Sequence, residues 1–446
     1  MFLSTPLFQS AIILALMIPS QISPSALSSR NIAVTQPDSE YRVMIHAMAP
    51  NTSWEIEGRE CALVKVLVDG RYDQHVFLVR GAEAADYEFL VGPLSPGDHT
   101  LLLEWDRSWT PELKDRPEVQ ITAATPINRS DPAQEPILRA PILHIRKDTF
   151  GRFSDLPLMI YWESESKDSP KKYTYTVILT NEDGGTNTER LMSRWGRTTD
   201  IEWIYDYAPG AGSAAETYQA QNHKTLTFRG KHEGLHPVLY DVTRNNNFAD
   251  SDPDPSAVRV RLVPVFADLH GLTRESVMDR FPWTYALMAR EMVRENKIEY
   301  PADPNTAAMS DQQNYAYIDI CAEQRGTELF FELETRNPDR WYRSDHADPK
   351  ARIERSGCFR TTIELPPGTA AQNIRRLRIQ CTPAPVAEGA SPVSAPQADI
   401  SRVTRLFFLA KDYSPGPNLL DKKVNRALKP GQSLVIPLDI KADVIK

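Results

Sequence analysis

Frequent prolines divide the chain into short apolar segments, and this spacing limits the folds that it can adopt. The sequence contains 35 prolines but only 20 glycines among its 446 residues. Proline breaks helices and the interior of sheets, whereas turns and sheet edges tolerate it. Many of the short segments also alternate apolar and polar residues, which is typical of half-buried strands. The sequence therefore predicts a mainly β protein rather than a helical bundle.

A chain of this length exceeds what one hydrophobic core usually supports, so we expect several domains. Strand-like segments recur through residues 30–125, and a hairpin turn is predicted at Asp69-Gly70. Their rhythm resembles an immunoglobulin- or fibronectin-like sandwich. Residues 126–140 show no periodicity, which predicts an interdomain linker.

Two further β domains are predicted after this linker. Residues 141–300 are expected to form a central β-sandwich-type domain that ends in one helix, beginning near Pro282. The stretch 186–195 shows no helical stripe, and the preceding 181–186 is predicted to be a tight turn. Residues 301–446 are expected to form a C-terminal β domain, in which the proline-rich stretch 382–398 is a flexible loop.

The N-terminal residues have the character of an export signal. The compact apolar run 11–18 is followed by Pro19 and small residues, and we expect residues 1–29 to be a signal peptide. The run is too short to span a bilayer core of ~30 Å. This predicts a periplasmic, extracellular or cell-surface protein with no transmembrane segment in its mature form. Because no Lys or Arg precedes the apolar run, a buried N-terminal segment is the alternative.

The cysteines limit the disulfides that can form, and the net charge limits the kind of partner that the protein can bind. We expect at most one disulfide among Cys321, Cys358 and Cys381, with Cys61 either unpaired or linking two domains. The net charge of -8 argues against a nucleic-acid partner. The expected partner is instead an extracellular ligand, such as a carbohydrate or an envelope component.

A candidate metal site lies in the central domain. If residues 200–207 form a strand, Asp200 and Glu202 share one face while Ile201 and Trp203 point into the core. Neighbouring carboxylates need positive charge, which a divalent cation or the nearby Arg194 and Arg197 would supply. Downstream histidines add further ligands suited to calcium, magnesium or zinc. The predicted ligand set is Asp200, Glu202, His223, His232 and His236.

The order of these motifs distantly resembles the necrosis-inducing proteins and their vacuolar-sorting-type relatives. Asp200-Ile-Glu202-Trp203 precedes the strand-like His236-Pro-Val-Leu-Tyr240. Those families carry an Asp-Trp-Glu element preceded by histidines, and a later Pro-Val-Val-Tyr-like strand, on a β-sandwich that holds a divalent cation. The resemblance implies that Asp200 and Glu202 correspond to their acids. This chain departs from the pattern, with Thr198 and Thr199 in place of the histidines.

Three functional hypotheses follow from these features. The first is an exported binding or envelope-associated protein with a divalent-cation site. The second is a secreted metal-dependent hydrolase, in which a cation activates water and a carboxylate acts as the base. The third is a structural surface protein without a site. Convergence of Asp200, Glu202 and the histidines on a pocket with an open coordination position would favour the hydrolase, closed coordination would favour a structural ion, and dispersion would favour the structural protein.

Overall fold

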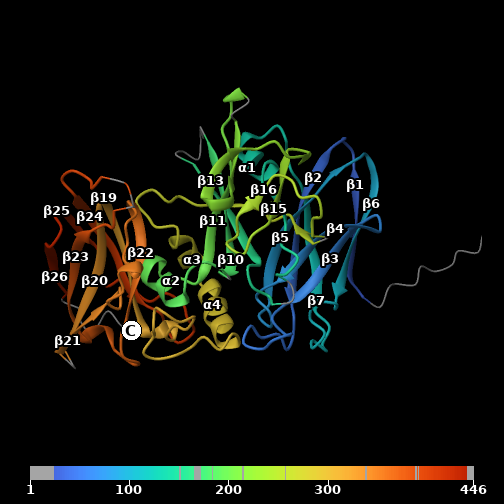
Figure 1. Cartoon of the computed structure of the whole chain (residues 1–446). Helices are drawn as coiled ribbons and strands as arrows, with labels where there is room; N and C mark the ends of the chain where they lie inside the picture. The colour runs from blue at the N-terminus through green and yellow to red at the C-terminus, as the bar shows by residue number, and fades with distance from the viewer. Residues whose placement is uncertain are drawn as a thin grey trace, which may run out of the picture.

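The computed structural model describes residues 25–438, apart from 150–151, 165–171, 183, 213–214, 257, 337–338, 387–388 and 390. Its strands form sheets in three successive parts of the chain, which confirms the prediction of a mainly β, multi-domain protein. The N-terminal strands (blue), the central strands (green) and the C-terminal strands (orange to red) lie side by side in a row (Figure 1).

The N-terminal part is a sandwich of two antiparallel sheets, ordered β1-β6-β3-β4 and β5-β2-β7. Alternating apolar residues of both sheets, including Val43, Ile45, Val64 and Val91, form its core. The strands are β1 (Ala26–Val34), β2 (Ser39–Met48), β3 (Ala62–Val68), β4 (Arg71–Leu78), β5 (Ala85–Leu94), β6 (Gly97–Asp106) and β7 (Glu118–Pro126).

The N-terminal boundary differs from the sequence prediction. Residues 26–29, which were assigned to the signal peptide, belong to β1, where Ser28 pairs with Leu103 of β6. β1 is an edge strand of its sheet, with Ala26 buried and Ser29 exposed, so one of its faces is solvated. The apolar run 11–18 lies outside the described residues.

The central part contains a six-stranded sheet, ordered β13-β12-β11-β10-β9-β18, and a smaller sheet in which β14-β15-β8-β17 are joined by β16. The larger sheet consists of β9 (Pro157–Glu163), β10 (Tyr173–Asn181), β11 (Thr199–Tyr207), β12 (Glu216–Ala220), β13 (Lys224–Thr227) and β18 (Val265–Phe266). The smaller sheet consists of β8 (Ile142–His144), β14 (His232–Glu233), β15 (His236–Asp241), β16 (Phe248–Ala249) and β17 (Arg259–Val260).

The helices of the central part correct two predictions. The predicted helix near Pro282 is present as α4 (Trp283–Arg294), and it follows α3 (Ser276–Arg280). Residues 188–195 also form a helix, α2 (Thr188–Trp195), which ends at Gly196 in the left-handed conformation. The predicted linker 126–140 contains the 3-10 helix η1 (Pro132–Gln134) and α1 (Glu135–Leu138). Leu138 and Ala140 are buried in the core, so this segment is packed rather than loose.

The C-terminal part is a second sandwich, with sheets ordered β22-β19-β24-β25 and β21-β20-β23-β26. The strands are β19 (Tyr315–Arg325), β20 (Thr327–Arg336), β21 (Asp339–Arg343), β22 (Gly357–Glu364), β23 (Ile374–Pro383), β24 (Gln397–Phe408), β25 (Lys422–Leu428) and β26 (Ser433–Pro437). Short 3-10 helices connect several elements: η3 (Gln221–His223), η4 (Gln312–Asn314), η5 (Pro349–Ala351) and η6 (Ala371–Asn373).

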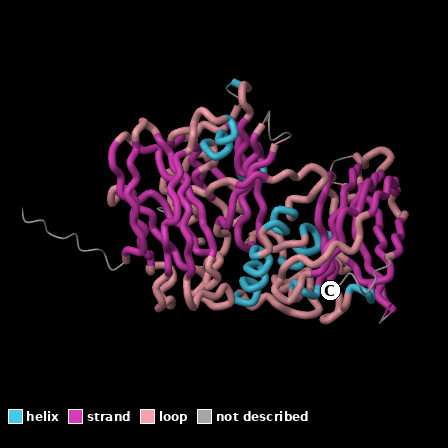
Figure 2. Tube along the Cα trace, turned by 180° about the vertical axis from the view of Figure 1, so that it is seen from behind, coloured by secondary structure: helices cyan, strands magenta, loops and turns pink. Residues whose placement is uncertain are grey.

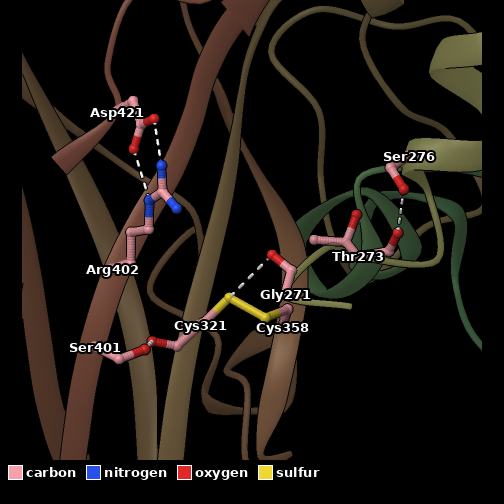
Figure 3. Close-up of a disulfide and its surroundings, with 8 residues drawn as sticks. All are labelled: Gly271, Thr273, Ser276, Cys321, Cys358, Ser401, Arg402 and Asp421. Atoms are coloured by element: carbon pink, nitrogen blue, oxygen red, sulfur yellow. Dashed lines mark hydrogen bonds and ion pairs between the residues drawn. A yellow bond between two sulfur atoms is a disulfide. The ribbon is translucent and has the colours of Figure 1, made fainter. Parts of the chain in front are cut away.

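One disulfide joins neighbouring strands of this sandwich. Cys321 of β19 is bonded to Cys358 of β22, directly opposite in the register (Figure 3). Cys61 and Cys381 are buried free thiols. The prediction of at most one bridge among the last three cysteines is therefore confirmed.

The three parts share a continuous apolar core. One cluster of buried side chains extends from Trp54 and Cys61, through the central sheet, to Phe407 and Leu409. Figure 2 shows most of the helical segments gathered between the central strands and the C-terminal strands. In the described part of the chain, no helix has the length and apolar character needed to cross a membrane.

Candidate functional site

Asp200 and Glu202 lie near the start of β11, in the middle of the larger central sheet. Asp200 is 4% exposed, and its Oδ2 accepts a hydrogen bond from Asn246 Nδ2 at 2.8 Å. Glu202 Oε2 accepts a hydrogen bond from Gln219 Nε2 and lies 3.8 Å from His223 Nδ1. Three of the five predicted ligands therefore occupy the same region.

The predicted alternation holds at the start of β11 and then fails. Ile201 is buried, as expected, but Trp203 is only half-buried. The pairing with β10 shifts between Tyr175 and Thr176, so Ile204 has no partner in the register and lies beside the buried Tyr205. A bulge of this kind adds one residue to a strand and reverses its inward and outward faces. Sequence periodicity alone did not reveal it.

The other two predicted ligands lie elsewhere. His232 Nε2 is 3.0 Å from Glu216 Oε1. His236 is fully buried: its Nδ1 lies 2.7 Å from the Ala140 carbonyl, and its Nε2 lies 2.8 Å from Glu40 Oε2 of the N-terminal sandwich. Since both ring nitrogens of His236 are engaged, it joins two parts of the fold.

The predicted five-residue metal site is therefore not assembled. Among the residues that the structure describes, no three His, Cys, Asp or Glu side chains are grouped as metal ligands. The prediction placed histidines together because they are close in sequence. The β14–β15 hairpin instead separates them, with His232 opposite Pro237 and Glu233 opposite His236.

A glutamate that the sequence analysis treated only as part of a turn completes an acidic cluster. Glu182 follows β10, and its backbone N–H donates to the Thr198 carbonyl just before β11. Burial, together with the negative charge of Asp200, raises the pKa of Glu182 to about 8. The same two causes raise the pKa of Glu202 to about 8. We call Glu182, Asp200 and Glu202 the acidic trio.

Arg194 and Arg197 were the alternative source of positive charge for Asp200 and Glu202, but both arginines contact other partners as well. Arg197 Nη1 is 3.9 Å from Asp200 Oδ1, but its Nε donates to Glu275 at 3.0 Å and its Nη1 donates to the Thr199 carbonyl. Arg194 lies 3.8 Å from Glu354. Arg197 thus compensates only part of the charge of the trio, which agrees with the raised pKa of two of its members.

A chain of buried polar groups connects the trio to a surface pocket. Asn246 Nδ2 also donates to Asp155 Oδ1 at 2.9 Å, and Arg146 Nη2 donates to Asp155 Oδ2 at 3.0 Å. Arg146 and Asp241 line a pocket of about 390 Å³. Burial raises the pKa of Asp241 well above its usual value, although Arg146 opposes the shift. Acidic side chains are therefore crowded along this side of the central part, with Arg146 among them.

Comparison with known proteins does not assign the chain. No family model matches it, and no curated protein matches it. The resemblance of residues 200–240 to the necrosis-inducing and vacuolar-sorting-type families stays a prediction.

Proposed function

We propose that this is an exported binding protein whose central part binds a divalent cation at the acidic trio. The observation that carries the proposal is the crowding of three carboxylates where β10 meets β11, in which burial and the charge of Asp200 raise the pKa of both Glu182 and Glu202 to about 8. Glu182 and Glu202 hold their protons this strongly because Arg197 and Arg274 compensate only part of the negative charge around Asp200. A cation would supply the missing positive charge and would displace the protons.

The side chains of the trio favour a hard cation. Carboxylate oxygens suit calcium or magnesium, whereas zinc prefers nitrogen and sulfur ligands. His223 is the one predicted histidine near the trio, since its Nδ1 lies 3.8 Å from Glu202 Oε2. Because no three such side chains are grouped as ligands among the described residues, binding would have to draw the carboxylates closer together.

The experiment is a calcium and magnesium titration of the purified chain, followed by calorimetry in buffers of different ionisation enthalpy. We expect binding with release of protons near pH 7, because the two glutamates are protonated in part before the cation binds. Asp200→Asn should weaken binding by about tenfold or more, since it removes one formal charge. The control Glu323→Gln, which changes an exposed acid of β19, should bind as the wild type does.

Absence of a chelator-dependent change in melting temperature would contradict cation binding. In that case the trio would be an acidic cluster whose charge is offset in part by Arg197 and Arg274. Only His223 of the three predicted histidines lies near the trio, so the site predicted for the metal-dependent hydrolase is not brought together, and we do not propose an enzymatic activity.

Export is the second part of the proposal. It is supported by the apolar run 11–18 and, weakly, by the Cys321–Cys358 disulfide, because disulfides persist mainly in oxidising compartments. N-terminal sequencing of the protein from the producing cells tests it. Recovery of intact Met1 from the cytosolic fraction only would contradict export.

A further inference from the structure

A pocket of about 380 Å³ lies where the N-terminal sandwich meets the central part. Its walls come from β4, β5, the start of β9 and the segments 260–265 and 281–283. β4 and β5 each stand at the end of their sheet, so the pocket lies along an open edge of this sandwich. Its size is within the range typical of small-ligand sites.

Most of the lining consists of apolar side chains of the shared core that are not fully covered. Six of them are only partly buried against that core, namely Tyr87, Leu262, Val263, Val265, Phe281 and Trp283. Four more keep 6–9% of their surface exposed, namely Phe77, Val79, Leu158 and Met159. The pocket therefore offers a ligand a mainly apolar surface.

The polar side chains of this lining already have partners. Gln74 donates a hydrogen bond to the Leu90 carbonyl. The two ring nitrogens of His75 contact an aspartate of β6 at 3.2 Å and a tyrosine of β4 at 2.7 Å. Asp86 and Glu88 accept hydrogen bonds from side chains of β2. These groups have little hydrogen-bonding capacity left for a ligand, so contact in this pocket is mainly apolar.

A second pocket of about 570 Å³ adjoins the first. The two pockets share four lining residues, Val79, Arg80, Phe281 and Trp283. In the second pocket Trp283, Leu287 and Arg290 follow one another at helical spacing along one side of α4. Residues 80–83 of the N-terminal part and 412–414 of the C-terminal part complete the lining, so all three parts of the fold meet here.

The second pocket is basic, because three arginines and two acids line it: Arg80, Arg280, Arg290, Glu83 and Asp412. Arg80 is paired with Glu83, and Arg290 lies 3.8 Å from a glutamate outside the pocket. Arg280 is exposed, and its Nη1 donates to a backbone carbonyl of β18 at 2.9 Å. In the described part of the chain no acidic side chain pairs with Arg280, so its charge is available to a ligand.

We propose that the two pockets together bind a single-chain amphipathic anion, such as a fatty acid. The hydrocarbon chain occupies the apolar pocket, where its burial is favourable. The anionic head lies in the second pocket, where the Arg280 guanidinium donates to it. A peptide segment fits less well, because its amide groups need hydrogen-bond partners that the apolar pocket does not offer. A neutral apolar molecule would gain nothing from the arginines.

The test is a calorimetric titration with dodecanoate, dodecyl phosphate and dodecanol, each below the concentration at which it forms micelles. Both anions should bind, and their order identifies the head group that the site prefers. Dodecanol has the same chain without the charge, and it should bind more weakly by about tenfold or more. Decanoate should bind more weakly than dodecanoate, by about fourfold for each methylene removed.

Two variants separate the role of the chain from that of the head. Val263→Glu places a charge in the apolar pocket and should weaken binding of all three probes by about tenfold or more. Arg280→Gln should weaken binding of the anions by about tenfold but leave dodecanol unchanged. The matched controls Val435→Glu and Arg325→Gln change exposed residues of the C-terminal sandwich that line neither pocket, and they should bind as the wild type does.

Melting temperatures of all variants are measured alongside. If Val263→Glu does not fold, Arg280→Gln still decides the result, because it changes an exposed side chain. Binding should persist with chelator and in Asp200→Asn, so failure of the cation proposal would not affect it. Absence of binding by both anions, equal affinity for dodecanol and dodecanoate, or anion binding that Arg280→Gln leaves unchanged would overturn the proposal.

Discussion

The protonation of Glu202 gives the acidic trio a measurable signature at the scale of one residue. Its folded pKa of about 8 lies above the usual value of 4.5. The unfolded chain therefore ionises first, so stability is full below about pH 4.5 and is lost as the pH rises towards 8. Glu202→Gln removes this loss, and we expect it to stabilise the protein by ~1–3 kcal/mol at pH 9 but hardly at pH 4.5.

Urea unfolding of both proteins across this pH range measures the effect. Glu323→Gln, at an exposed position of β19, is the control and should show no such pH-dependent gain. A stability difference between Glu202→Gln and wild type that stays constant from pH 4.5 to 9 would contradict the raised pKa.

Sequence reasoning found part of this cluster and missed part of it for physical reasons. The alternation of Asp200, Ile201 and Glu202 depends only on local strand geometry, so it was predictable. Glu182 joins them because Asn181 pairs with Thr199 across two strands, which no local pattern encodes. The partner of His236, Glu40, is 196 residues away in the chain. The residues next to His236 in the sequence therefore give no sign that His236 links two parts of the fold.

At the scale of elements, α2 depends on the left-handed residue that ends it. Gly196 has φ of +65°, and its N–H donates to the Met192 carbonyl at 2.8 Å. A Cβ at this position would lie 2.5 Å from Arg360 Cγ of β22. Gly196→Ala should therefore cost ~1 kcal/mol for the backbone, and further free energy because Arg360 must move.

Gly210→Ala is a matched control, because Gly210 also has positive φ but has nothing within 4 Å of its added Cβ. We expect Gly196→Ala to destabilise the protein by ~1–3 kcal/mol more than Gly210→Ala in urea unfolding. Equal effects would mean that the contact between α2 and β22 adapts without strain.

The two main helices of the central part differ in how well their sequences predict them. α4 spans 12 residues, which is long enough for apolar residues to recur along one face of the helix. It begins just after a proline, which is a recognisable start signal in the sequence. α2 has only 8 residues, with Leu191 and Met192 buried. So short a helix does not repeat its apolar stripe, and its stability comes from packing against β22 rather than from propensity. That packing is not visible in the local sequence.

At the scale of the whole molecule, the continuous core predicts cooperative unfolding. Buried side chains of all three parts belong to one cluster, and buried ion pairs cross both junctions. Separate domains joined by linkers would melt independently, whereas parts that share a core lose it together. Scanning calorimetry should show one main transition for the wild type, and well-separated transitions would contradict a shared core.

Arg360 provides the sharpest test of this coupling, because it joins α3 to the C-terminal sandwich. Its guanidinium is fully buried and binds Asp319 of β19 at 2.6 and 2.8 Å, and Asp279 of α3 at 2.8 Å. Arg360→Met would leave the Asp319 carboxylate buried without this cation, which should cost ~3–5 kcal/mol near pH 7. Because burial already raises the pKa of Asp319, protonation should relieve part of that cost as the pH falls.

In scanning calorimetry of Arg360→Met, we expect the C-terminal sandwich to unfold in a separate transition at a lower temperature than the rest of the chain. The difference between the two transition temperatures should become smaller as the pH falls towards 5. Arg402→Met is the matched control, since Arg402 forms an exposed pair with Asp421 (Figure 3), and it should cost ~0–1 kcal/mol without splitting the transition. If Arg360→Met unfolds in one transition at the wild-type temperature, the buried ion pairs do not couple the parts, and the apolar core alone holds them together.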